Sequence, residues 1–246
     1  MSSLIIIPAR LGSTRLPNKI LADINGKTMI RRVCDQARKV KNSNVYIACG
    51  DQQIASEVRS FAGKYIMTDP NLPSGTDRIY AAFSQLSLTS NYAYIVNLQG
   101  DVPNIDPAVI EETINVLNEK DECDIATAVI EFSDEGKAND PNIVKAIANF
   151  GANNNISECI DFKRGKPVDC NNLYYEHIGI YVYRKAVLEK FVKLDQSNRE
   201  ISEKLEQLRA LDNGMRIFAC LINSDKKPIN VDTEASLEQA RNIITD

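Results

Sequence analysis

The first half of this 246-residue chain alternates short apolar runs with amphipathic segments. The apolar runs are rich in β-branched residues and predict buried strands, whereas the segments between them have helical spacing. The predicted strands are 4–7, 45–49, 65–67 and 93–98, and the predicted helices are 29–40, 52–61, 74–86 and 106–117. Such alternation is typical of an α/β fold with a mostly parallel sheet covered by helices on both faces. Because ligands of such sheets bind beyond the carboxyl ends of the strands, we expect the site in the loops that follow them.

The second half of the chain has a different layout, which begins near residue 121. Strands are predicted at 125–132, 143–148, 178–183 and 215–221, and helices at 200–211 and 236–244. The polar, asparagine-rich stretch 151–172 is predicted to form a loop. The pattern therefore indicates a second sheet region whose strand order differs from that of the first.

Charge and cysteine usage narrow the class of protein. The formal net charge of -4 argues against a broad basic surface for nucleic acid. No apolar stretch is long enough to cross a membrane, and the run 4–7 is too short for the core of a signal peptide. The six cysteines are scattered without a C-x-x-C pair, a pattern typical of reduced thiols in a cytoplasmic protein.

The loop after the first predicted strand, residues 8–19, has the composition of a phosphate-binding loop. Arg10 and Arg15 can fork onto phosphate oxygens, and Lys19 adds a compact positive charge. Gly12 allows backbone N–H groups to approach such oxygens closely, with Ser13 beside it. The spacing matches neither the Walker A motif nor the Rossmann glycine fingerprint. A solvated basic loop is the alternative interpretation.

Two aspartates that are far apart in the sequence are candidates for a metal site. Asp101 follows the predicted strand 93–98, and Asp232 precedes the last predicted helix. Hard divalent cations such as Mg²⁺ prefer carboxylate oxygens, and they neutralise charge that collects during phosphoryl chemistry. The alternative interpretation is structural, because either aspartate can cap a turn or a helix.

Two further segments are open to both a functional and a structural interpretation. Residues 74–78, Ser-Gly-Thr-Asp-Arg, place hydroxyl groups and a glycine at a predicted helix start, which suits either an anion or a simple helix cap. His177, the only histidine, lies in an apolar stretch that reads as a buried strand. A single strand histidine is more often a core residue than a catalytic one.

Several segments together resemble the 3-deoxy-manno-octulosonate (Kdo) cytidylyltransferases, which activate an acidic eight-carbon sugar for lipopolysaccharide synthesis in Gram-negative bacteria. The loop 7–19 resembles the opening of this family and of related sugar-nucleotide transferases. Residues 177–184 (His-Ile-Gly-Ile-Tyr-Val-Tyr-Arg) and 205–209 (Leu-Glu-Gln-Leu-Arg) are more discriminating. The segments 99–101 (Gln-Gly-Asp) and 231–233 (Val-Asp-Thr) resemble the family's metal-binding motifs.

This resemblance implies an enzyme that transfers CMP from CTP to Kdo, gives CMP-Kdo and pyrophosphate, and uses Mg²⁺ as cofactor. It implies catalytic roles for Arg10, Lys19, Asp101 and Asp232, of which the two aspartates hold the metal. The implied nucleotide-binding residues are Arg10, Gly12, Ser13, Arg15, Lys19, Ser74, Gly75, Thr76, Arg78, Gln99 and Asp101. The implied sugar-binding residues are Gln99, Arg164, His177, Tyr181, Glu206 and Gln207. Metal coordination, rather than His177, is expected to acidify the attacking sugar hydroxyl.

The same resemblance implies a single domain over 1–246 and a homodimer. Its Rossmann-like sheet of nucleotide-diphospho-sugar transferases would form a nucleotide-binding half at about 1–120. A smaller mixed sheet at about 121–230 would serve sugar binding and dimerisation, and residues 231–246 would return to the first half.

Two departures from the family pattern leave alternatives open. Val102 stands where the family usually has the glutamate of Gln-Gly-Asp-Glu-Pro, which alters the surroundings of the metal site. The segment 162–167 retains Phe162 and Arg164 but not the residues around them. A cytidylyltransferase for another acid sugar, such as an amino-Kdo or a sialic acid, is therefore one alternative, and a catalytically silent nucleotide-binding relative is another. A dehydrogenase is disfavoured because the glycine fingerprint is absent.

Overall fold

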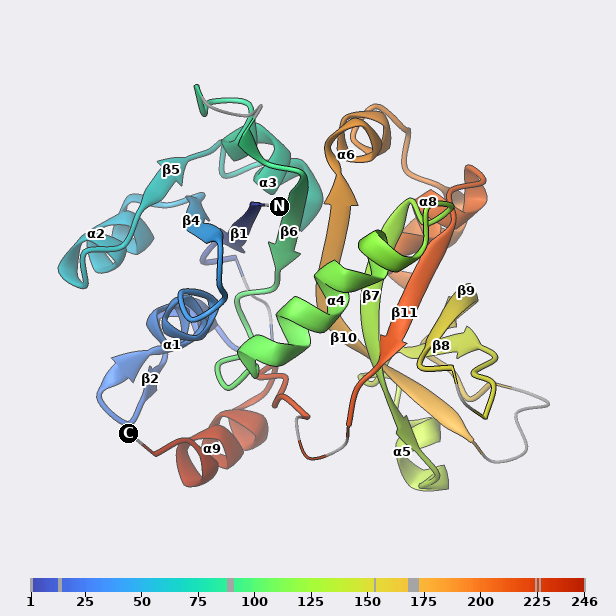
Figure 1. Cartoon of the computed structure of the whole chain (residues 1–246). Coiled ribbons are helices and arrows are strands. Elements are labelled where there is room, and N and C mark those ends of the chain that lie inside the picture. The colour runs from blue at the N-terminus through green and yellow to red at the C-terminus, as the bar shows by residue number, and fades with distance from the viewer. Residues whose placement is uncertain are drawn as a thin grey trace. The chain divides into compact units, whose positions relative to one another are not determined.

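The structure is a computed structural model that describes residues 2–12, 15–87, 91–152, 154–167, 173–223, 225 and 227–245. The chain divides into two compact units. Unit 1 comprises Met1–Ile110 and Pro228–Asp246, and unit 2 comprises Glu111–Lys227. The carboxyl-terminal segment thus belongs to the same unit as the first strand (Figure 1).

Unit 1 contains four parallel strands in the order β5-β4-β1-β6. They are β1 (Ser3–Ala9), β4 (Ser43–Cys49), β5 (Tyr65–Met67) and β6 (Tyr94–Leu98). The side chains from Leu4 to Ile7 are fully buried, which explains the unbroken apolar run in the sequence. A parallel strand covered on both faces has no solvent-facing side on which to place polar residues.

Unit 1 also contains helices and a short hairpin. They are α1 (Met29–Ala37), α2 (Gln52–Ser60), α3 (Gly75–Phe83) and α9 (Glu234–Ile243), and α4 (Pro107–Glu119) continues into unit 2. A 3-10 turn, η1 (Lys19–Leu21), precedes the hairpin of β2 (Asp23–Ile24) and β3 (Lys27–Thr28). Leu237 and Ala240 of α9 pack with Ile24 and Met29 in one apolar cluster. This packing returns the end of the chain to unit 1.

Unit 2 contains five strands in the order β10-β7-β11-β9-β8. They are β7 (Ile125–Phe132), β8 (Lys145–Ala148), β9 (Ile156–Lys163), β10 (Tyr174–Arg184) and β11 (Ile217–Leu221). β7 pairs in parallel with β11 and antiparallel with β10, and β9 pairs antiparallel with both β8 and β11. The pairing of the whole chain is therefore mixed: the strands of unit 1 are parallel, and the antiparallel pairs lie in unit 2, for which the family resemblance implies a mixed sheet.

Two sequence-based assignments in unit 2 are wrong. The stretch 151–172, predicted as loop, contains β9, in which Ile156, Cys159 and Phe162 are buried, whereas Ile160 and Lys163 are exposed. The predicted helix 200–211 is two helices, α7 (Asn198–Glu203) and α8 (Gln207–Asp212). The break falls at Lys204, whose φ of 55° is left-handed and ends α7. The helices α5 (Glu135–Asn139) and α6 (Lys185–Phe191) complete the unit.

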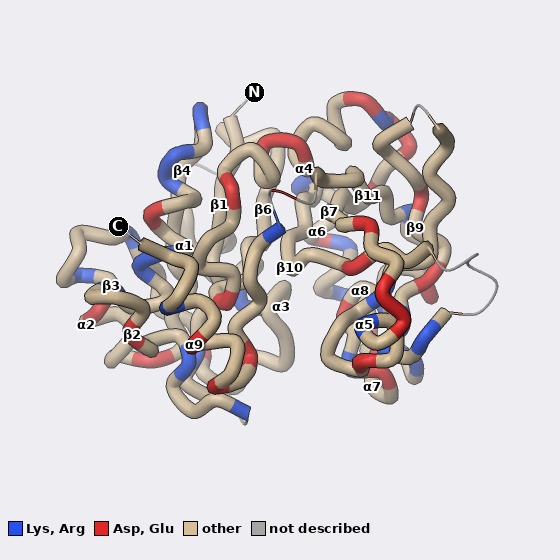
Figure 2. Tube along the Cα trace, turned by 90° about the horizontal axis from the view of Figure 1, so that it is seen from below, with Lys and Arg blue, Asp and Glu red and all other residues tan. Residues whose placement is uncertain are grey.

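Charged residues are spread over both units, and the described cysteines are buried. Basic and acidic residues are interspersed along the described trace of each unit (Figure 2). Five cysteines, Cys34, Cys49, Cys123, Cys159 and Cys220, are buried free thiols, and Cys170 lies outside the described residues. Among the helices that the structure describes, none combines the length and apolar character needed to cross a membrane.

Candidate active site

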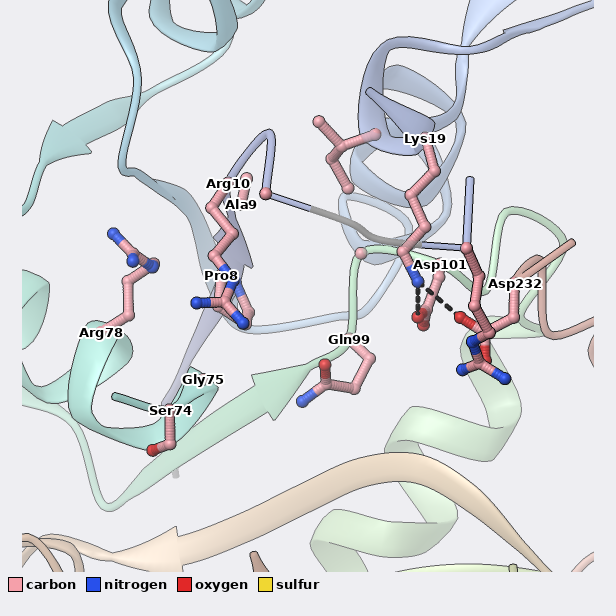
Figure 3. Close-up of a pocket in the computed structure, with 14 residues that line it drawn as sticks. Pro8, Ala9, Arg10, Lys19, Ser74, Gly75, Arg78, Gln99, Asp101 and Asp232 are labelled. Atoms are coloured by element: carbon pink, nitrogen blue, oxygen red, sulfur yellow. Dashed lines mark hydrogen bonds and ion pairs between the residues drawn. The ribbon is translucent and has the colours of Figure 1, made fainter. Parts of the chain in front are cut away.

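Unit 1 contains a pocket of about 310 Å³ beyond the carboxyl ends of β1 and β6 (Figure 3). This volume suits a small-molecule ligand. The lining residues come from four segments that are distant in the sequence: Pro8, Ala9, Arg10, Gly12, Arg15, Lys19, Ile20, Ser74, Gly75, Arg78, Gln99, Gly100, Asp101 and Asp232. The site therefore lies where the sheet topology places ligands of α/β folds.

The ammonium group of Lys19 joins the two candidate metal-binding aspartates. Its Nζ donates to Asp101 Oδ2 and to Asp232 Oδ1, each at 2.7 Å (Figure 3). Arg15 Nη2 donates to the other oxygen of Asp232 at 2.8 Å. Burial on its own lowers the pKa of Lys19, but the two carboxylates outweigh it and raise that pKa above its usual 10.5. Lys19 is therefore a firmly held cation between the aspartates.

Backbone contacts explain why Asp101 and Asp232 lie together. The amide of Val231 donates to the carbonyl of Asp101 at 2.9 Å, which joins the two segments directly. Thr233 caps α9, and its side chain accepts from Ser236 N, so the capping role falls to Thr233 and leaves the Asp232 carboxylate to the pocket. Gly100 permits the approach of the turn, because a Cβ there would lie 2.5 Å from Ile20 Cδ1.

The aspartate pair fits a hard divalent cation by its donor chemistry. Both carboxylates already neutralise one shared cation, and both side chains are about one-fifth exposed. Within the described ranges, no group of three or more His, Cys, Asp or Glu side chains could hold a metal. Two carboxylates plus oxygens from substrate phosphate and water match the way proteins usually bind Mg²⁺.

The opening loop, residues 8–19, has a hydrogen bond near its start and a left-handed residue near its end. Leu11 N donates to Asp51 Oδ2 at 3.0 Å, and Asn18 adopts a left-handed φ of 55° just before η1. A Cβ at Gly12 would meet nothing within 4 Å, so the chain itself does not require glycine there. Gly12 thus leaves open space in the pocket lining. Ser13 lies outside the described residues.

The start of α3 contributes to the pocket and is also a capped helix terminus. Ser74 accepts from Asp77 N, which confirms the helix cap, and Ser74 and Gly75 also line the pocket. Thr76 is fully buried, accepts a hydrogen bond from Asn97 at 3.1 Å and is not a lining residue. Arg78 donates to Thr68 Oγ1 and to the carbonyl of Asp69. Burial, reinforced by Arg10, lowers the pKa of Arg78.

The remaining candidate residues lie in unit 2. Among them, His177 contacts the Thr127 hydroxyl, which bears on which ring nitrogen carries the proton. Its Nε2 lies 2.9 Å from Thr127 Oγ1, and the Thr127 hydroxyl donates its single proton to the Ile180 carbonyl at 2.7 Å. A hydroxyl that donates to Ile180 accepts from His177, and this arrangement corresponds to a ring proton on Nε2 and an acceptor at Nδ1. Desolvation lowers the pKa of His177 from 6.5 to about 3, so the ring is neutral.

Tyr181 and Gln207 form a second polar pair. The Tyr181 hydroxyl donates to Gln207 Oε1 at 3.0 Å, and Gln207 is only 5% exposed. Gln207 Nε2 is buried without a hydrogen-bond partner. Because a buried N–H left unpaired is costly, this donor is a candidate contact for an acceptor on a ligand.

The corner between α7 and α8 is held by two arginines. Arg209 makes two hydrogen bonds to the Glu200 carboxylate, at 2.5 and 2.8 Å, and both side chains are buried. Arg164 donates to the carbonyls of Glu203, Lys204 and Pro141. In the structure, Arg164 thus satisfies carbonyls at the end of α7, a role that the sequence pattern does not indicate. Glu206 is the residue immediately before α8.

The pH dependence of stability should report the neutral state of His177. An unfolded chain binds a proton at histidine below pH 6.5, whereas the folded chain does not until about pH 3. Stability is therefore lost as pH falls through this window, by roughly 2 kcal/mol between pH 6.5 and 5. We expect His177→Gln to remove this part of the slope, measured by urea unfolding at pH 5, 6 and 7. The chain has one histidine, so equal slopes in both proteins would contradict the assignment.

Sequence reasoning located most of the pocket but missed several of its supports. Pro8, Ala9 and Gly100 lie within the predicted loop 8–19 and the motif 99–101, whereas the apolar Ile20 lines the pocket without any signal in the sequence. Asp51, which anchors the opening loop, follows directly after β4 and Gly50. Its position after a strand end was the available signal. Thr127 is internal to a predicted strand and Glu200 is the first residue of a predicted helix, and neither position gives a functional signal.

Comparisons with known proteins identify the family of the chain. The sequence profile of the cytidylyltransferase family matches residues 4–217. The chain is 40% identical over 244 residues to a 3-deoxy-manno-octulosonate cytidylyltransferase of Paramagnetospirillum magneticum, covering 99% of this chain and 98% of that protein. It is 43% identical over 241 residues to the enzyme of the same name from Brucella ovis, covering 98% and 95%.

A solved structure of a CMP:2-keto-3-deoxy-manno-octonic acid synthetase complexed with CTP matches the fold with a TM-score of 0.87 and 33% identity. The match covers 99% of this chain and 98% of that one. The chain therefore belongs to the 3-deoxy-manno-octulosonate cytidylyltransferase family.

Proposed function

We propose that the chain transfers CMP from CTP to Kdo and releases pyrophosphate, which supplies CMP-Kdo for lipopolysaccharide biosynthesis. The observation that carries this proposal is the aspartate pair held around Lys19, beside Arg10 and Arg15, in a pocket of triphosphate-binding composition. Full-length relatives at about 40% identity carry the name of this reaction.

The cationic side chains of the pocket bind the triphosphate of CTP. Arg10 and Arg15 can each offer a fork of N–H donors, and Lys19 offers a compact charge. Gly12 allows close backbone approach to phosphate oxygens, with Ser13 next to it, and Ser74 and Gly75 border the same pocket. Arg78 lines the pocket too and adds a further cation, whereas Thr76 is buried against Asn97 and acts through the start of α3.

Asp101 and Asp232 are the residues that would hold Mg²⁺. When bound, the ion would neutralise the negative charge that collects on the α-phosphate and on the departing pyrophosphate. The chain's own contribution is to fix both carboxylates before the substrate arrives, through the Val231–Asp101 backbone bond and the Thr233 cap. Catalysis by such a site is positioning plus charge neutralisation.

Sugar recognition is proposed for Gln99, Arg164, His177, Tyr181, Glu206 and Gln207. Gln207 Nε2 offers a donor, and His177 Nδ1 offers an acceptor to sugar hydroxyls. His177, with its pKa of about 3, is too weak a base to take the hydroxyl proton. Arg164 is proposed to meet the sugar carboxylate with N–H groups other than the three that donate to backbone carbonyls.

We also propose that the chain works as a homodimer in the cytoplasm. Buried free thiols at five described cysteines support a reducing compartment. Ile160 and Ile201 of unit 2 are 72% and 58% exposed, and a dimer interface that covered them would remove this apolar surface from water.

Pyrophosphate release tests the proposed reaction. With CTP and Mg²⁺, we expect pyrophosphate only when an acid sugar is added, and fastest with Kdo among Kdo, its amino analogue and a sialic acid. The readout is phosphate after added pyrophosphatase, and reactions without sugar or with ATP in place of CTP are the controls. A faster reaction with another acid sugar would reassign the substrate, and no release with any sugar would exclude the enzyme.

A further inference from the structure

Thr127 is a buried hydroxyl residue of unit 2 to which the proposed function gives no role. It lies on β7, which runs antiparallel to β10 (Figure 1), and its side chain is fully buried. The pairing of these strands is interrupted between Ile178 and Tyr181, where β10 carries residues without a partner on β7. A bulge of this kind leaves backbone groups out of the strand ladder.

The Thr127 hydroxyl contacts both the bulge of β10 and the ring of His177. It donates to the Ile180 carbonyl, which lies within the bulge, at 2.7 Å. The same oxygen lies 2.9 Å from His177 Nε2. Since a hydroxyl has one proton, the first contact determines that the second is a bond from His177 to Thr127.

We propose that Thr127 is a positioning residue that holds His177 as the Nε2–H tautomer, so that Nδ1 accepts a hydrogen bond from a hydroxyl of the acid sugar. This inference rests on the proposed function, because it takes His177 as a sugar contact. Phe162 and Tyr181 restrict the ring further, with centroids 5.3 and 5.2 Å from that of the imidazole. The aromatic contacts limit the orientation of the ring, and the Thr127 hydroxyl sets its proton.

Loss of the hydroxyl would remove the reason for this tautomer. With valine at position 127, a ring proton on Nε2 would face an apolar group, which leaves a buried donor unpaired. The ring would then favour the Nδ1–H tautomer. In the variant, Nδ1 would therefore present a hydrogen-bond donor to the sugar hydroxyl, whereas in the wild type it presents an acceptor. The expected consequence is weaker sugar binding with little change at the nucleotide pocket of unit 1.

The single histidine makes the tautomer directly measurable. Protein labelled with ¹⁵N-histidine gives signals from His177 alone. In long-range ¹H–¹⁵N correlation spectra, Nε2 couples to both ring C–H groups and Nδ1 mainly to one, so the protonated nitrogen is identified. We expect wild type and Thr127→Ser to carry the proton on Nε2, and Thr127→Val to shift it to Nδ1.

Steady-state kinetics supply the functional readout. Thr127→Val is expected to raise the KM for Kdo about 10-fold, the effect of one hydrogen bond, while the KM for CTP stays within about 2-fold. Thr127→Ser should restore the wild-type values. Thr113→Val is the matched control, because Thr113 is also fully buried in unit 2 and its hydroxyl lies 3.7 Å from Cys220 Sγ.

Each outcome decides between the alternatives. An Nδ1–H tautomer in the wild type overturns the proposal even if Thr127→Val fails to fold. A shifted tautomer with an unchanged KM for Kdo also overturns it, because Thr127 would then support the strand alone. Absence of CMP transfer by wild type would instead reject the proposed function, while the spectra would still report the tautomer.

Discussion

Asp101→Asn is expected to lower kcat for CMP transfer by roughly 10³-fold, about 4 kcal/mol of transition-state stabilisation. The amide keeps the shape of the side chain but removes one of the two negative charges that would hold Mg²⁺. It also removes one of the two carboxylates that share the Lys19 ammonium group. Initial rates of pyrophosphate release at saturating CTP and Kdo measure the effect.

Asp35→Asn is a suitable control for this experiment. Asp35 belongs to unit 1 and pairs with Lys27 at 3.7 Å. Both side chains are about one-third exposed, and neither residue lines the pocket that contains Asp101. Its replacement should leave kcat within about 2-fold, because exposed ion pairs contribute little. A melting temperature close to that of wild type would show that Asp101→Asn is folded. A folded Asp101→Asn protein with near-normal kcat would contradict the metal-binding role of the aspartate.

Lys19→Met is expected to have opposite effects on nucleotide turnover and on metal binding. Turnover should fall by about 10²-fold in kcat/KM for CTP, because the triphosphate loses a compact cation. Metal affinity without nucleotide should rise by about 10-fold or more, because Asp101 and Asp232 lose the ammonium group that neutralises them. In the wild type, a divalent ion must compete with Lys19 for the two carboxylates.

Binding of Mn²⁺, followed by the electron paramagnetic resonance signal of the free ion, separates the two effects. The measurement is made without nucleotide on wild type, Lys19→Met and Lys27→Met. Lys27 is a surface lysine of unit 1 paired with Asp35, so its replacement should change neither quantity. Equal Mn²⁺ affinity in wild type and Lys19→Met would show that the ammonium group does not compete for the metal site.

Local patterns in the sequence predicted correctly those strands in which the apolar residues are the buried ones. The apolar run of β1 is buried on both faces, and β5 and β7 begin and end where the sequence pattern predicts. The composition of the opening loop favoured phosphate binding because of its place after a strand, although three cations in a loop also suit a solvated surface. The pattern was wrong where polar residues occur inside an element, as in β9, which it predicts as loop, and at the Lys204 break, where it predicts one helix instead of α7 and α8.

The sequence by itself thus indicated the parallel strands and the α-helices of unit 1, but not η1 or the β2–β3 hairpin, and it indicated the family to which the motifs point. Only the tertiary structure decided which distant groups meet. Asp101 and Asp232 come together through a backbone bond that no local pattern encodes, and the proton of His177 follows from a bulge on a paired strand. The physical reason is that residue propensity and periodicity act within one element, whereas contacts between elements depend on the packing of the whole unit.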